Sequence, residues 1–252
     1  MVEIALSLAI IGFALVAIIG VLPTGMNVQK ENREETIVNQ DANYWMEKIR
    51  AGAPPLNDFD LTNYVTSIIQ YVTPCNANGT AAGVTTSNVY TPGNASPNFR
   101  LVNSQRVIGL LSTPKYLVPT KGQGGYLSNY VVAYVRALTG PVADKPPQGN
   151  PDVLDTAFTY RMVAEVVPHA GFVALTPPPG LGSDRFSLNF AANLQTNLYD
   201  VRLLFRWPLL PNGNTGPGRQ TYRTVVAGQL VAVPPQRPLW YFLEPDSYAT
   251  SP

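Results

Sequence analysis

The sequence predicts an α+β protein in which a long N-terminal α-helical stalk carries a β-rich globular head built on an antiparallel sheet. An apolar run fills residues 1–22, and helical periodicity continues to about residue 52. Beyond that point, short alternating segments are separated by turn residues, as in sheet proteins. We therefore assign residues 1–52 to the helix and residues 53–252 to the head domain.

The apolar run contains one charge, Glu3. At 1.5 Å per residue, about 20 helical residues cross a bilayer, so the run is long enough to do so. A carboxylate in lipid costs about 2.5–3.5 kcal/mol on insertion scales, and it needs a compensating partner. The simplest partner is the N-terminal amine of a neighbouring copy. Residues 1–25 are therefore expected to form a transmembrane or filament-core segment.

Residues 26–52 have the pattern of an amphipathic helix. Val38, Ala42, Trp45 and Ile49 recur at spacings of four, three and four, which places them on one helix face. This face is expected to pack against the head. The opposite side is expected to carry the polar residues Asp41, Asn43, Glu47, Lys48 and Arg50.

Gly20, Pro23 and Gly25 interrupt the helical pattern. Proline removes a backbone donor and costs about 3 kcal/mol inside a helix, and glycine costs about 1 kcal/mol. We expect a kink or a short unwound stretch between Gly20 and Gly25. A plain proline kink in a lone membrane anchor is the alternative.

The head shows weaker patterns. Helical spacing predicts a short amphipathic helix over residues 56–72, and residues 73–98 are polar and loop-like. A short strand is expected at 101–102, a short helix at 107–111, and strands at 126–139 and 158–167. Two more strands, 200–207 and 220–231, flank a turn-rich segment and predict an antiparallel hairpin. The proline-rich tail from Pro234 is expected to run extended, with Trp240, Tyr241 and Phe242 docked on an apolar surface.

The sequence gives little support for chemistry. Charged residues make up 13% of the chain and the net charge is +1, so nothing suggests a nucleic-acid partner. The single cysteine, Cys75, favours a structural thiol, and the single histidine, His169, leaves no multi-histidine metal site. We expect no enzyme activity, catalytic residue, metal or cofactor. The sequons at Asn78 and Asn94 are possible glycosylation sites, with chance occurrence as the alternative.

The segment from Glu3 through Ile4 to Pro23 resembles the start of type IV pilins and pseudopilins. The 20-residue separation of Glu3 and Pro23, together with residues 202–208 and 218–224, is similar to the large pilin-like cassette proteins of Verrucomicrobia. The resemblance implies an extracellular structural filament subunit, anchored in the inner membrane before pilus or secretion machinery assembles it with its own copies, with adhesion supplied by the heads. It implies assembly roles for Glu3, Phe13, Gly20, Pro23 and Gly25.

Two alternatives remain at this point. A minor pseudopilin that primes or caps a secretion or pilus machine would carry the same helix. A single-span envelope protein whose head binds a ligand or hydrolyses a polymer would also need only one apolar segment.

Overall fold

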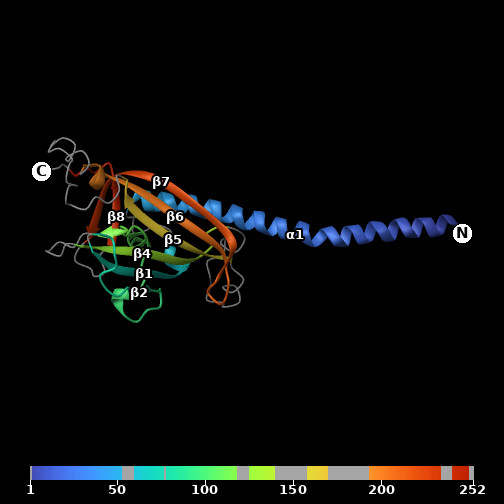
Figure 1. Ribbon diagram of the computed structural model, residues 1–252, viewed down its shortest axis with the longest axis horizontal. Coiled ribbons are helices and arrows are strands. Elements are labelled where there is room, and N and C mark those ends of the chain that lie inside the picture. Colours follow the sequence, from blue (N-terminus) through green and yellow to red (C-terminus); the bar gives the residue numbers. More distant parts are fainter. Residues whose placement is uncertain are drawn as a thin grey trace.

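The computed structural model describes residues 2–52, 60–76, 78–117, 125–139, 158–169, 193–233 and 240–249. It has a long N-terminal helix, α1 (Val2–Ala51), followed by a head of antiparallel strands (Figure 1). The predicted α+β class, with a helical stalk and a β-rich head, is confirmed. The first part of α1 projects from the head, and the second part lies against the sheet.

The strands pair in the order β2-β1-β4-β5-β6-β7-β8, with β3 pairing β4. Every named pair is antiparallel. Their bounds are β1 Val65–Asn76, β2 Thr86–Tyr90, β3 Tyr116–Leu117, β4 Gly125–Arg136, β5 Thr159–Pro168, β6 Leu198–Leu209, β7 Thr215–Val233 and β8 Trp240–Pro245. The predicted hairpin is therefore confirmed as the β6–β7 pair, which is longer than the sequence indicated.

Alternation along the strands decides which side chains enter the core. On β5, Tyr160, Met162 and Val166 are fully buried on the inner face, while Arg161 and Glu165 lie partly exposed on the outer face. This is the period-two pattern of a strand with one face covered. The inner face packs against the second half of α1 and contributes to one continuous hydrophobic core.

The predicted helix over residues 56–72 is wrong in its described part. A single 3-10 turn, η1 (Leu61–Asn63), leads directly into β1. Residues 65–73 include Val65, Ile68, Ile69 and Val72, and β-branched side chains favour strands. Strand β4 supplies a partner along the whole length of β1, which satisfies its backbone groups.

The remaining head elements fall between the strands. The predicted loop 73–98 contains the end of β1, all of β2 and part of a 3-10 turn, η2 (Pro97–Phe99), and no strand forms at 101–102. The predicted helix is confirmed as α2 (Ser104–Leu111), whose N-cap Asn103 accepts a hydrogen bond from the Arg106 backbone N–H. Side-chain caps of this kind satisfy a helix-terminal donor.

The last strand meets the first helix. Strand β8 pairs with β7 and contacts both α1 and α2, and its residues 240–243 are buried. Gly52 ends α1 with φ of +82°, and a Cβ at this position would lie 2.2 Å from the Leu243 carbonyl oxygen. Glycine is therefore required where the helix terminus passes over β8. The expected docking of Trp240, Tyr241 and Phe242 is confirmed, with a strand in place of irregular extended chain.

Candidate functional site

The candidate functional site is the projecting half of α1, because it combines an unusually apolar surface with complete exposure. Residues 2–33 are all exposed. The helix is long and apolar enough to cross a membrane, and its most apolar window is not buried in the head. Fully burying one Leu, Ile, Val or Phe side chain is worth about 1.5–3 kcal/mol. This surface therefore gains a large stabilisation from any apolar environment that covers it.

Its large exposed side chains surround the helix and do not form a single stripe. Phe13 is 79% exposed, and a helix that is apolar all round is typical of a membrane span or of a helix packed among others. The exposed set comprises Val2, Ile4, Leu6, Leu8, Ile10, Ile11, Phe13, Leu15, Val16, Ile18, Ile19, Val21, Leu22, Met26 and Val28.

Glu3 lies in the first turn of α1. A negative charge at this end interacts favourably with the helix dipole. The Glu3 backbone carbonyl accepts a hydrogen bond of 2.7 Å from Ser7 Oγ. Within the described residues, the Glu3 carboxylate has no ion-pair partner. Its charge is therefore available to a partner outside the chain.

The break expected between Gly20 and Gly25 does not unwind the helix. The helix runs through Pro23 without interruption. Proline removes only its own hydrogen bond to the carbonyl at Ile19, and the neighbouring hydrogen bonds of this long helix can persist around it. Figure 1 shows a shallow bend partway along the projecting part. Of the two expectations, a kink or an unwound stretch, the unwound stretch is wrong for the single chain.

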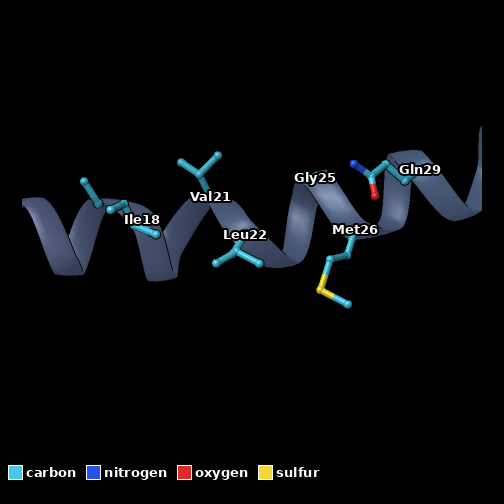
Figure 2. Close-up of a pocket in the computed structure, with 7 residues that line it drawn as sticks. Ile18, Val21, Leu22, Gly25, Met26 and Gln29 are labelled. Carbon is cyan, nitrogen blue, oxygen red and sulfur yellow. The ribbon is translucent and has the colours of Figure 1, made fainter.

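A shallow groove lies along the helix on either side of the proline. Figure 2 shows its lining, which is Ala17, Ile18, Val21, Leu22, Gly25, Met26 and Gln29. These residues are spaced by three or four and so share one face. A Cβ placed on Gly25 would meet nothing within 4 Å. Small residues such as Ala17 and Gly25 permit a close approach of another helix backbone in apolar surroundings.

The second half of α1 is fixed in the head. Val38, Ala42, Trp45 and Ile49 have no solvent exposure and lie in the hydrophobic core. Trp45 also donates a hydrogen bond of 3.0 Å from its indole nitrogen to the Tyr160 hydroxyl. The face defined by the helical spacing is therefore the face that seats the head.

Asp41 corrects the sequence interpretation, because it lies on this buried face and not on the polar side. Its Oδ2 accepts hydrogen bonds from the Leu138 N–H at 2.8 Å and from the Tyr160 hydroxyl at 2.9 Å, and its Oδ1 accepts one from Thr139 Oγ1 at 2.8 Å. Burial raises the pKa of Asp41, and these hydrogen bonds oppose the shift. Burial likewise holds the pKa of Tyr160 well above its usual range. A buried carboxylate thus joins α1 to β5 and to the segment that follows β4.

The signal for this network was present in the helical spacing. Asp41 follows Val38 by three residues and precedes Trp45 by four, so it shares their face. The identity of its partners depends on residues about 100 positions away, which no local pattern reveals.

The other candidate residues do not converge on a site. Asn78 is exposed in a turn and Asn94 is half-buried, so Asn78 is the better placed of the two sequons. Cys75 is half-buried in β1. His169 contacts Asp200 through Nδ1 at 2.8 Å. In the described part of the chain, no group of three or more His, Cys, Asp or Glu side chains is arranged to hold a metal ion.

Comparisons with known proteins leave the site to be interpreted from its geometry. No protein-family model, curated protein or solved structure matches this chain.

Proposed function

We propose that this protein is the repeating structural subunit of an extracellular pilus-like filament, held in the inner membrane by α1 until it assembles. The observation that carries the proposal is the division of α1. About 30 exposed helical residues, of which those up to Leu22 form the apolar run, extend from a second half that is fixed in the head by core packing and a buried carboxylate. A helix presented in this way is suited to parallel packing with identical helices.

Assembly is the mechanism in this proposal. Before assembly the bilayer covers the apolar half of α1, and in the filament the same half of neighbouring copies replaces the lipid. The groove beside Pro23 offers a close contact for a neighbouring helix. Glu3 sets the axial register by pairing with the N-terminal amine of another copy, which removes the cost of an unpaired charge in an apolar core.

The experiment compares Glu3→Ala with Glu31→Ala, a matched change at another exposed glutamate of α1. Cells that carry each variant are sheared, and the released filaments are counted by electron microscopy and identified by mass spectrometry of their main protein. Glu3→Ala should leave the protein membrane-bound but reduce filaments at least tenfold, while Glu31→Ala leaves their number unchanged. Normal filaments from Glu3→Ala cells would refute the role of this carboxylate.

The same experiment separates the alternatives. A chain present at only a few copies per filament would be a minor pseudopilin. A chain that stays wholly in the membrane fraction, with no filament containing it, would be a single-span envelope protein whose head binds a ligand.

A further inference from the structure

Three arginines lie directly opposite one another on the outer face of the sheet. The strand register pairs Arg161 with Arg206 and Arg206 with Arg219, across β5, β6 and β7. We call these three residues the arginine row. Arg206 and Arg219 are exposed, and Arg161 is partly exposed. Like charges placed directly opposite on neighbouring strands destabilise a sheet, by up to about 1 kcal/mol for each pair.

The arginine row has no neutralising carboxylate within the described structure. Arg161 donates a hydrogen bond of 3.3 Å to the Tyr130 hydroxyl, which carries no charge. A chain that keeps three unneutralised guanidinium groups together breaks a rule of sheet design, and such exceptions concentrate where proteins bind something.

A second pair of arginines lies four residues further along the same strands. Arg202 and Arg223 are opposite one another, and both donate to Asp200. The carboxylates on β5, β6 and β7 are Glu165 and Asp200. Glu165 is already paired with Lys115 at 2.9 Å, so neither carboxylate is left for the arginine row. The excess positive charge of this face is therefore concentrated at the arginine row, although the chain as a whole is nearly neutral.

The strip between the two sets of arginines is largely apolar. Val163, Leu204 and Thr221 occupy it, at paired positions of the three strands. Leu204 and Thr221 are exposed, and Val163 is buried beside them. At about 3.3 Å per residue, the two arginine sets are about 13 Å apart. The surface thus presents the unneutralised arginine row on one side of the strip. On the other side lies a charge-compensated band, in which Arg202 and Arg223 share Asp200 and Arg202 lies opposite Glu165.

We propose that this face binds an acidic polysaccharide, whose carboxylate or sulfate groups contact the arginines and whose sugar rings lie on the apolar strip. Guanidinium groups bind such anions through paired hydrogen bonds. On β5 to β7 the strip carries no aromatic side chain, so it lacks the run of stacking residues typical of single-stranded nucleic-acid sites; the one exposed aromatic side chain at the arginine row is Tyr130 of β4, bonded to Arg161. Strands β6 and β7 run roughly along α1, so the face is turned sideways to any bilayer that α1 crosses (Figure 1).

This proposal rests on the proposed function only in placing the head outside the cell. Its test uses the full chain as single subunits in a zwitterionic detergent, where filament assembly is not needed. A failure of the polysaccharide proposal is therefore distinguishable from a failure to form filaments.

The experiment measures binding of polygalacturonate by isothermal titration calorimetry. The variant Arg161→Gln/Arg206→Gln/Arg219→Gln is compared with Arg33→Gln/Arg50→Gln/Arg100→Gln, which removes three arginines outside this face. We expect the first to weaken binding at least tenfold and the second less than threefold. Because the first variant relieves repulsion between like charges, its melting temperature should equal or exceed that of the parent. The single change Arg206→Gln, at the centre of the row, should weaken binding about threefold. It replaces the triple variant in the binding measurement if the triple variant does not fold.

Equal losses in the two triple variants would overturn the proposal, since they would show a general charge effect. No binding of polygalacturonate by the parent chain would also overturn it. Tighter binding of a single-stranded oligonucleotide, or of vesicles containing anionic phospholipid, would replace the polysaccharide with that partner.

Discussion

The two halves of α1 are continuous in one helix, yet they have opposite surroundings. The more apolar half is exposed throughout residues 2–33, while the less apolar half is buried at Val38, Ala42, Trp45 and Ile49. Hydropathy alone would predict the reverse. Burial within the chain follows the helical spacing of Val38, Ala42, Trp45 and Ile49, and the half of α1 without such a pattern stays exposed.

Removing the largest side chain of the seated half should have the greatest effect. Trp45→Ala deletes a fully buried indole and its hydrogen bond to Tyr160, and should lower the free energy of unfolding of the head by about 3–5 kcal/mol. Phe13→Ala, an aromatic truncation in the exposed half, should change it by less than about 0.5 kcal/mol. Urea unfolding of the full chain in mild detergent measures both. Similar losses in the two variants would end the distinction between the halves.

Removing the buried carboxylate of Asp41 should cause the next largest loss in the free energy of unfolding. Asp41→Ala leaves the Leu138 N–H and the Tyr160 hydroxyl without their acceptor, and unpaired buried donors cost about 1–3 kcal/mol. Glu47→Ala changes an exposed carboxylate of the same helix and should be close to neutral. Urea unfolding applies here as well, and an Asp41→Ala chain as stable as the parent would show that the network is not what secures α1.

The pH dependence of stability should distinguish Asp41 in the seated helix from Asp200 on the outer face. Burial raises the pKa of Asp41 above 3.8, so the folded chain binds a proton there more tightly than the unfolded chain does. The stability that this proton binding adds is complete below about pH 3.8 and is lost as pH rises through the folded-state pKa. Burial also opposes ionisation of Asp200, but hydrogen bonds from His169, Arg202 and Arg223 prevail and lower its pKa. Its contribution is present above about pH 3.8 and is lost as pH falls.

Melting temperatures of Asp41→Asn and Asp200→Asn, measured from about pH 3 to about pH 6, test this difference. Relative to the parent, Asp41→Asn should gain stability as pH rises, and Asp200→Asn should lose it. Slopes of the same sign in the two variants would contradict the assignment of opposite pKa shifts.

Replacing the helix-breaking residues Gly20, Pro23 and Gly25 should have the smallest effect on the stability of the head. Gly20→Ala/Pro23→Ala/Gly25→Ala restores helix formers in the exposed half and should leave the unfolding free energy of the head within about 0.5 kcal/mol. In a filament the straightened helix should alter the rise per subunit or block polymerisation. A side-chain-resolution map of the variant filament checks this, and an unchanged rise with unchanged packing would show that the bend has no role in assembly.

The parts of the fold that local patterns predicted are those with one regular period. Alternation at Tyr160, Met162 and Val166 predicted β5, and turn residues predicted the β6–β7 hairpin. Strand β1 was mistaken for a helix because Leu61, Val65, Ile68 and Val72 are also spaced by three and four. Its β-branched side chains were the better guide, and its partner β4 is remote in sequence.

The two candidate surfaces, the exposed apolar helix and the arginine row, also differ in whether the local sequence predicts them. The exposed apolar helix was predictable because its composition alone defines it. The arginine row was not, because Arg161, Arg206 and Arg219 come from three strands and meet only through their register. The partners of Asp41 were hidden for the same reason.

The contact between Gly52 and β8 has a consequence for the order in which the protein is made. The ribosome releases α1 first and β8 last, yet the C-terminal end of the helix is held against the Leu243 carbonyl. During synthesis, the contact at the C-terminal end of α1 therefore cannot form until β8 has emerged, after every other strand of the sheet. A polypeptide cut before Trp240 would keep the exposed apolar helix but would lack β8, which the C-terminal end of α1 contacts.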